Sequence, residues 1–127
     1  MVEESKTGMH IIKKCLVITI QTELDDNVLL DLQKEILDKA EKTSVKGVIL
    51  DVSYVNIIDA FMFEIIINTA QMIKLLGKEM VISGMKPEVA GSLSNFDFDI
   101  NKIKLANCVE HGYEVLNSTK SNVEKGN

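Results

Sequence analysis

Residues 47–62 read GVILDVSYVNIIDAFM, and this stretch decides the fold. Its first part, residues 47–52, is apolar on both alternating faces, which is typical of a strand covered on both sides of a sheet. Asp59 then stands where a helix of about four turns is expected to begin. That helix runs to Leu76, and Gly77 supplies the left-handed residue that commonly ends a helix. A buried strand that leads into a helix is the repeating unit of an α/β domain.

The alternation of strand and helix continues on both sides of this stretch. Residues 15–21 form a second two-sided apolar run, and Asp25 or Asp26 is placed to cap an amphipathic helix after it. The other expected strands are 9–12 at an edge, 80–83 and 102–105, and the other expected helices are 27–42, 87–93 and 108–116. This order predicts a single α/β domain over residues 9–116, with a mostly parallel sheet of four or five strands, about four helices and right-handed crossovers. Residues 1–8 and 117–127 are expected to be a flexible N-terminus and a flexible tail.

Composition narrows the class of protein. The 127 residues are 46% hydrophobic, which suffices for one domain with its own core. The net charge is -5, and no basic run carries interleaved aromatics, so the composition argues against nucleic-acid binding. The apolar run 57–73 is broken by polar residues from Asp59 to Gln71, which excludes a membrane span there. Cys15 and Cys108 lie far apart without a secretory signal, and this favours reduced thiols in a cytoplasmic protein.

Residue types that carry catalysis or bind metals do not gather in a recognisable pattern. Cys108 and His111 have a C-x2-H spacing, but no second cluster of Cys or His completes a zinc site. Turn and cap chemistry explains the acidic pairs at residues 25–26 and 97–99. No glycine-rich nucleotide-binding loop is present. The sequence therefore predicts a protein that is not an enzyme and needs neither a metal nor a cofactor.

The helix expected after Asp59 is apolar over most of its circumference. A core-facing stripe is expected from residues at helical spacing: Phe61, Ile65, Thr69, Met72, Ile73 and Leu76. Phe63, Ile66 and Ile67 lie outside that stripe and allow two interpretations. Either the helix is deeply packed, or these side chains are exposed and form a partner or self-association surface. Replacing Phe63 with glutamate separates the two, because only an interface residue would leave a folded monomer.

Three segments together resemble one known family. CLVITIQTELDD begins at Cys15, GVILDVSYVNIIDAF at Gly47 and KEMVISGMKPEVAGSL at Lys78, and in this order they resemble the RsbS-type members of the STAS family over about residues 9–116. The resemblance implies a non-catalytic anti-sigma-factor antagonist that joins larger RsbR-type STAS paralogues in the cage-like stressosome of general stress signalling. It also implies a homo-oligomer or large hetero-oligomer that sequesters an RsbT-type serine kinase and releases it on phosphorylation. The alternative is a free-standing, SpoIIAA-like antagonist that binds an anti-sigma kinase without a large assembly.

The residue after Asp59 departs from the family pattern. Members commonly carry a Ser or Thr there that the partner kinase phosphorylates, whereas this chain has Ala60, so the resemblance implies a regulatory position at which phosphorylation is blocked. Ala60 is either an introduced Ser-to-Ala substitution, which the typical flanking residues favour, or native to a divergent homologue that is regulated elsewhere. The candidate alternative phospho-acceptors are Ser53, Ser92 and Ser94, and the implied partner surface comprises Asp59, Ala60, Phe61, Phe63 and Glu64.

Overall fold

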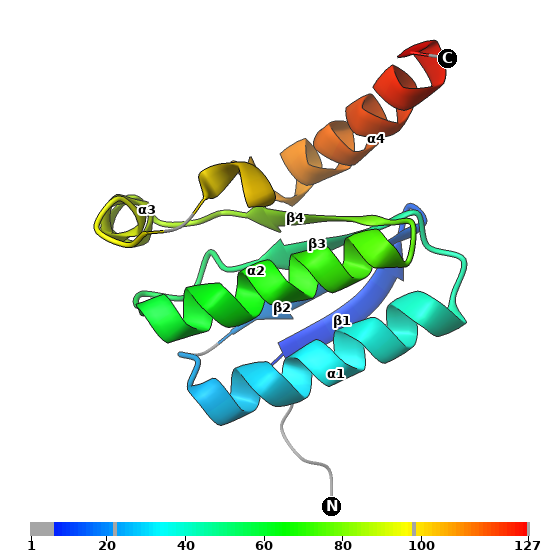
Figure 1. Ribbon diagram of the computed structural model, residues 1–127. Coiled ribbons are helices and arrows are strands. Elements are labelled where there is room, and N and C mark those ends of the chain that lie inside the picture. Colours follow the sequence, from blue (N-terminus) through cyan, green and yellow to red (C-terminus); the bar gives the residue numbers. More distant parts are fainter. Residues whose placement is uncertain (1–6, 22, 98, 127) are drawn as a thin grey trace, which may run out of the picture.

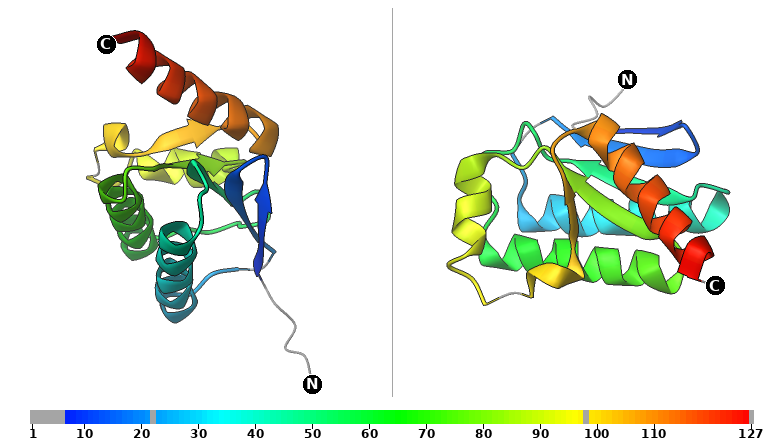
Figure 2. Two further views of the ribbon diagram at one scale, coloured as in Figure 1. Left: turned by 90° about the vertical axis from the view of Figure 1, so that its right-hand side faces the viewer. Right: turned by 90° about the horizontal axis from the view of Figure 1, so that it is seen from above.

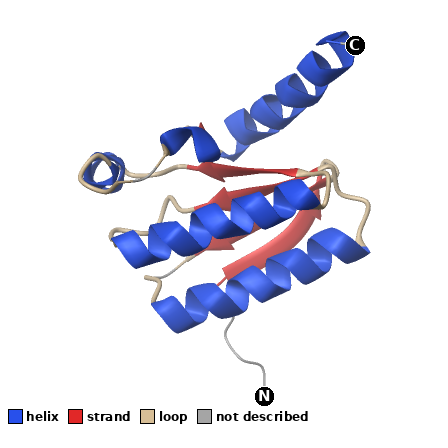
Figure 3. Cartoon of the chain, in the orientation of Figure 1, coloured by secondary structure: helices blue, strands red, loops and turns tan. Residues whose placement is uncertain are grey.

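The computed structural model describes residues 7–21, 23–97 and 99–126 (Figure 1). The strands are β1 (Thr7–Ile12), β2 (Cys15–Ile20), β3 (Gly47–Asp51), β4 (Glu79–Ser83) and β5 (Lys104–Ala106). The helices are α1 (Asp26–Lys42), α2 (Ala60–Leu75), α3 (Pro87–Leu93) and α4 (Val109–Gly126), with a 3-10 turn, η1, at Ile100–Lys102. The strands, red in Figure 3, form one sheet in the order β1-β2-β3-β4-β5, in which β1 is antiparallel to β2 and the other pairs are parallel. The predicted α/β class, with a mostly parallel sheet and about four helices, is confirmed.

Helices cover the sheet on both faces (Figure 2). Helices α1 and α2 lie side by side on one face, where they enclose the larger core together with residues such as Ile18, Leu50 and Ile82. Helix α4 packs on the other face, where Tyr113 and Leu116 join a second, smaller core. This two-sided burial explains why β2, β3 and β4 read as continuous apolar runs rather than alternating ones.

Local chemistry fixes the ends of the two long helices. Asp25 caps α1, since its Oδ1 atom accepts the backbone N–H of Val28 at 2.8 Å. Helix α2 ends at Leu75, and Gly77, two residues beyond, has a φ of 82° in the left-handed region. The Gly77 N–H donates to the Lys74 carbonyl, and the Lys78 N–H donates to the Ile73 carbonyl. This is the Schellman pattern of a helix end, so the cap predicted at Gly77 is confirmed.

A two-residue turn, Lys13-Lys14, joins β1 to β2. Its φ angles are 54° and 66°, so both lysines are left-handed as a type I′ hairpin requires. The Lys13 ammonium lies 3.5 Å from a carboxylate oxygen of Glu110 and 4.8 Å from the centre of the Tyr113 ring. Through these two contacts the hairpin interacts with α4. Because type I′ turns usually contain Asn-Gly or Asp-Gly, the sequence did not show this turn.

Several boundaries differ from those expected. Strand β1 begins at Thr7, so residues 7–8 of the expected N-terminal segment belong to the sheet, while residues 1–6 lie outside the described residues. Residues 102–103 precede β5 because η1 takes part of that segment. Helix α4 continues past Leu116 to Gly126, since residues 117–125 contain neither glycine nor proline to end it. Residue 116 is therefore not an element boundary, and the flexibility of the tail stays a prediction.

Candidate partner-binding surface at the start of helix α2

The loops after β2, β3 and β4 meet at one end of the molecule, where α1 and α2 begin and α3 lies (Figure 1). Asn56 joins the three loops. Its backbone N–H and side-chain amide both donate to the Glu23 carboxylate, with the amide at 2.7 Å, and its side-chain carbonyl accepts the Lys86 ammonium at 2.5 Å. The carboxyl ends of parallel strands are where α/β domains commonly place their binding sites. The hydrogen bonds of Asn56 therefore link the three loops to one another at this end.

Helix α2 begins at this end with Ala60. Asp59 is the N-cap, and its Oδ1 atom accepts the backbone N–H of Met62 at 2.9 Å. The Asp59 carbonyl accepts the Phe63 N–H at 3.0 Å and closes the first turn. Both Asp59 and Ala60 are exposed, and the first turn of α2 carries no acidic side chain. The position predicted to be regulatory therefore lies on an accessible helix N-terminus, where backbone N–H groups and the helix dipole favour an anion.

The loop that leads into this helix and the first turn of the helix carry exposed apolar side chains. Tyr54 and Ile57 on the loop before α2 are 60% and 67% exposed, and Phe61 in the first turn is 49% exposed. Large apolar side chains grouped on a small domain mark an interaction surface more often than scattered ones do. Sequence reasoning missed Tyr54 and Ile57 as surface residues, because a loop has no periodicity from which their exposure could be read.

The predicted partner surface is wrong at one residue. Asp59, Ala60, Phe61 and Glu64 are all exposed as such a surface requires. Phe63 is fully buried, and its ring meets that of Phe96 edge to face with centroids 5.8 Å apart. Phe63 is therefore a core residue and takes no direct part in a partner contact.

The two interpretations of α2 are resolved in favour of deep packing. Ile66 and Ile67 are buried along with Phe63, so none of the three forms the exposed patch that was the alternative. In the predicted stripe, Ile65, Thr69 and Ile73 are buried, whereas Phe61, Met72 and Leu76 are substantially exposed. The predicted stripe assumed that α2 is covered on one face only. Helix α2 contacts both the sheet and α1, so its buried side is wider than that stripe and is centred on different residues.

The candidate serines occupy different environments. Ser53 is half-buried in the loop after β3; its N–H donates to Asp51 Oδ1 at 3.1 Å. Ser92 and Ser94 belong to α3 and its C-cap, where their hydroxyls donate to the Val89 and Gly91 carbonyls. Ser94 is exposed and Ser92 is half-buried. None of the three lies in the first turn of α2, and their phosphorylation stays a prediction.

The cysteines and histidines do not form a joint site. Cys15 is buried in β2 and Cys108 is exposed, and neither takes part in a disulfide. Burial raises the pKa of the Cys15 thiol, and the Lys46 ammonium offsets part of that effect. The Nδ1 atom of His111 accepts the Asn107 N–H at 2.9 Å. Within the described ranges, no group of three Cys, His, Asp or Glu side chains is arranged to hold a metal, and no helix is long and apolar enough to cross a membrane.

Comparison with known proteins places this geometry in a family. The STAS domain profile matches residues 7–111. The chain is 24% identical over 99 residues to the RsbT co-antagonist protein RsbRA of Bacillus subtilis, a match that covers 78% of this chain. Two such curated co-antagonists match, and this chain spans about a third of their length, 35% and 32%.

Two solved structures have the same fold. A serine-to-glutamate variant of RsbS from Moorella thermoacetica superposes with a TM-score of 0.79 at 24% identity, over 92% of this chain and 99% of that one. A chain in a structure of the stressosome, described as a signal integration and transduction hub, superposes with a TM-score of 0.70 at 20% identity. The match covers 89% of this chain and 98% of that one. At these identities the structures show a shared fold.

Proposed function

Because this chain belongs to the STAS family, we propose that it is a cytoplasmic, non-catalytic stressosome protein that holds an RsbT-type serine kinase through the exposed start of α2. The observation that carries the proposal is the first turn of α2, where Asp59, Ala60 and Phe61 are all exposed. The names of the curated relatives point the same way, since both are RsbT co-antagonists. RsbR-type paralogues are then the partners with which this chain would assemble.

The proposed surface combines the two features that a specific protein contact needs. Phe61 and Ile57 offer apolar area that is exposed in the free chain, and burial of such area is the main driving force of association. Asp59 and Glu64 add carboxylates around it, which select a partner with basic groups. The Asn56 contacts with Glu23 and Lys86 hold the loop in place, which reduces the entropy that binding costs.

A phosphate at residue 60 would act on the partner more than on the fold. The N-terminus of a helix tolerates an anion, because unpaired N–H groups and the positive dipole end face it. A partner surface that covers the same turn would meet an added charge of about -1.5 to -2. Each 1.4 kcal/mol of unfavourable contact weakens binding about tenfold, so a few kcal/mol suffices for release. Alanine has no hydroxyl to accept the phosphate, and we therefore propose that Ala60 keeps this chain in the kinase-retaining state.

The experiment compares the chain with its Ala60→Ser variant on an immobilised RsbT-type kinase. Without ATP, both are expected to be captured equally. With ATP and magnesium, Ala60→Ser is expected to gain phosphate and dissociate, whereas the original chain stays bound. Phosphate incorporated at Ser53, Ser92 or Ser94 together with dissociation of the original chain would contradict the proposed block, and failure of both proteins to bind any such kinase would contradict the proposed function.

A charge series isolates the electrostatic part of the proposal. Ala60→Glu places a carboxylate in the first turn, and Ala60→Gln is the matched neutral control of the same size. We expect Ala60→Glu to keep the thermal stability of the chain, because the helix N-terminus favours the charge. Its affinity for the kinase should fall at least tenfold below that of Ala60→Gln. Equal affinities for the two variants would show that charge at residue 60 does not control the contact.

A further inference from the structure

A polar cleft lies between α2 and the edge of the sheet at β5. Its polar side chains come from α2, β4, η1 and β5: Gln71, Lys74, Glu79, Asn101, Lys102 and Lys104. The cleft exists because β5 is short. Strand β5 pairs only with residues 81–83 of β4, and among the described strands none pairs with Glu79 and Met80 at this edge. Turn η1 contacts α2 there and brings Asn101 and Lys102 to the cleft.

Lysines dominate the charge of the polar cleft. Lys74 and Lys102 are exposed, Lys104 is half-buried, and none of the three forms an ion pair with a carboxylate among the described residues. Glu79 is half-buried and likewise has no ion pair within the part of the chain that the structure describes. Three lysines and one glutamate in the lining leave the cleft with two uncompensated positive charges. Solvent screens charges in a partly enclosed site less than it screens charges that project freely.

The small volume of the cleft restricts what it can bind. The volume is about 30 Å³, and a single water molecule needs about 10–15 Å³. Pockets that enclose a whole small molecule have volumes of roughly 300–1,000 Å³. The cleft therefore receives one compact group, such as a phosphoryl group, and excludes the ring system of a nucleotide.

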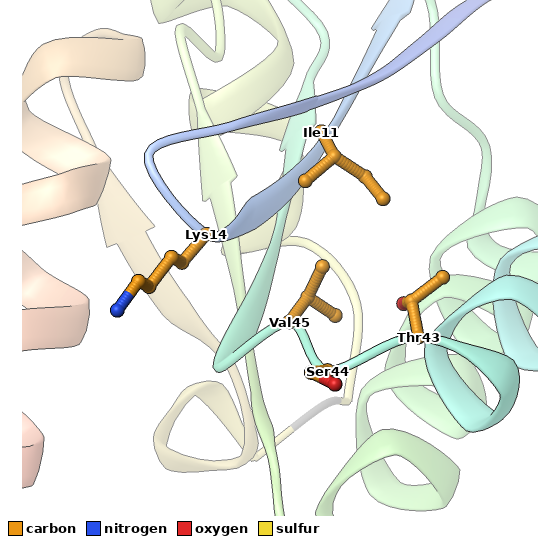
Figure 4. Close-up of a pocket in the computed structure, with 5 residues that line it drawn as sticks. All are labelled: Ile11, Lys14, Thr43, Ser44 and Val45. Carbon is orange, nitrogen blue, oxygen red and sulfur yellow. The ribbon is translucent and has the colours of Figure 1, made fainter.

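A larger pocket beside the hairpin between β1 and β2 lacks the charge of the polar cleft. It is lined by Ile11, Lys14, Thr43, Ser44 and Val45 and has a volume of about 280 Å³ (Figure 4). The side chain of Lys14 extends away from this pocket, and Ile11 and Val45 give it an apolar wall (Figure 4). A lysine beside a pocket thus does not by itself make an anion site, whereas the polar cleft has three lysines in its lining.

We propose that the polar cleft binds a phosphate-type oxyanion through Lys74, Lys102 and Lys104. A phosphoryl group carries a charge of about -1.5 to -2 at pH 7, which matches the two uncompensated positive charges of the cleft. A carboxylate carries a single charge and would leave one of them unmatched. Lysine binds phosphate as a point charge, which needs no fixed geometry. The carboxamides of Gln71 and Asn101 add N–H donors for the phosphate oxygens.

The proposed anion site is separate from the proposed kinase surface. Gln71 lies 11 positions after Ala60 on α2, which is about 16 Å at 1.5 Å per residue. The inference therefore does not depend on kinase binding. Two sources share this phosphate chemistry: free inorganic phosphate, and a phosphorylated side chain of another protein.

The test follows the backbone amide signals of the full chain by NMR while sodium phosphate is added. The pH and the ionic strength are held constant, with sodium chloride as the balancing salt. We expect saturable shifts at residues that line the cleft, such as Gln71, Asn101 and Lys104. Sodium chloride alone should not produce them, because chloride carries one charge and cannot accept from several donors at once.

Four variants test the role of the cleft side chains. Lys74→Gln and Lys104→Gln each remove a positive charge, so the dissociation constant for phosphate should rise at least about fivefold. Lys39→Gln is the matched control, because Lys39 is also an exposed lysine in the last turn of a helix but does not line the cleft. Glu79→Gln removes the carboxylate of the cleft and should strengthen phosphate binding, an effect that a purely structural role would not produce. Circular dichroism checks that each variant is folded.

Three results would overturn the anion site. The first is the absence of saturable shifts with phosphate. The second is that Lys39→Gln weakens phosphate binding as much as Lys74→Gln does. The third is that Glu79→Gln does not strengthen it.

A pair of peptides identifies the source of the phosphate group. One peptide contains phosphoserine, and the other has serine at the same position. Tighter binding of the phosphoserine peptide than of inorganic phosphate supports a phosphorylated protein as the ligand, whereas tighter binding of inorganic phosphate supports the free ion. Equal binding of both peptides at the cleft overturns the inference.

Kinase capture separates this inference from the proposed function. Lys104 is on β5, outside the surface around Ala60, so Lys104→Gln should bind the immobilised kinase as the original chain does. Capture without phosphate binding overturns only the anion site. Phosphate binding without capture overturns only the proposed kinase binding.

Discussion

The Oδ1 atom of Asp59 accepts the backbone N–H of Met62 at 2.9 Å, and this hydrogen bond fixes the residue at which α2 begins. Replacing an N-cap aspartate with alanine leaves that N–H without its partner and typically costs about 0.5–2 kcal/mol. We therefore expect Asp59→Ala to lower the free energy of unfolding by about 1 kcal/mol, as measured by urea denaturation. Asp59→Ser should recover most of the loss, because serine is also a good N-cap residue.

Helix α1 offers a matched control for the cap. Asp25 accepts the Val28 N–H at 2.8 Å in the same geometry, so Asp25→Ala should cost a similar free energy. The two variants should differ in kinase binding, because only Asp59 lies beside Ala60. If Asp25→Ala and Asp59→Ala lost the same stability and the same affinity for the kinase, Asp59 would have no specific part in the kinase-binding surface.

Phe63 and Phe61 have opposite roles two positions apart on the same helix. Phe63 is fully buried against Phe96, so Phe63→Ala leaves a cavity and should cost about 3–5 kcal/mol of unfolding free energy. Phe61 is about half exposed, and Phe61→Ala should cost less than about 1 kcal/mol while weakening kinase binding. Thermal denaturation and the binding assay check the pair. A folded, stable Phe63→Ala would contradict the core assignment.

We expect the buried thiol of Cys15 to make the folded protein less stable at alkaline pH. Burial raises the folded-state pKa of this thiol, so the unfolded state loses its proton first as the pH rises past about 8.5. The stability that the neutral thiol contributes is complete below that pH and falls through the interval up to the raised pKa. Burial raises the pKa of Tyr113 as well, which adds a loss of the same sign at higher pH. Urea denaturation between pH 7 and pH 9.5 should show a smaller decline in Cys15→Ala than in the original chain.

The elements that the sequence predicted are those whose signals are local. Strands β2 and β3 are apolar on both alternating faces because helices cover both sides of the sheet, and this pattern is visible without the fold. The caps at Asp25 and Gly77 follow from the backbone geometry that each residue favours. Ala60 could be placed at the start of a helix because Asp59 precedes it. Each of these features depends on a few neighbouring residues.

The features that the sequence could not give depend on contacts between distant residues. Asn56 joins Glu23 and Lys86, which lie 33 and 30 positions away in the chain, and nothing local distinguishes it from an ordinary loop asparagine. The burial of Phe63 depends on the positions of α1 and Phe96, so helical periodicity alone could not separate packing from exposure. The pocket at Ile11 and Val45 likewise exists only once β1 lies beside the loop after α1.

The Lys13-Lys14 turn stores backbone strain that one substitution should relieve. A left-handed conformation costs an ordinary residue about 1–2 kcal/mol, whereas glycine adopts it freely. Lys14 has a φ of 66°, and the described residues show no ion pair from its ammonium. Lys14→Gly should therefore raise the unfolding free energy by about 0.5–1 kcal/mol, after the extra entropy of glycine in the unfolded chain is subtracted. Lys13→Gly relieves the same strain but loses the contacts with Glu110 and Tyr113, so its gain should be smaller.

Gly77→Ala measures the free-energy cost of placing a side chain on a left-handed residue of this protein. Gly77 has a φ of 82° and open space around its α-carbon, so the substitution imposes backbone strain without a steric clash. It should lower the unfolding free energy by about 1 kcal/mol, opposite in sign to Lys14→Gly. Urea denaturation of the three variants in one buffer measures the order. The prediction is wrong if Gly77→Ala loses stability but Lys14→Gly is no more stable than the original chain. The side chain of Lys14 would then stabilise the hairpin by as much free energy as its left-handed backbone costs.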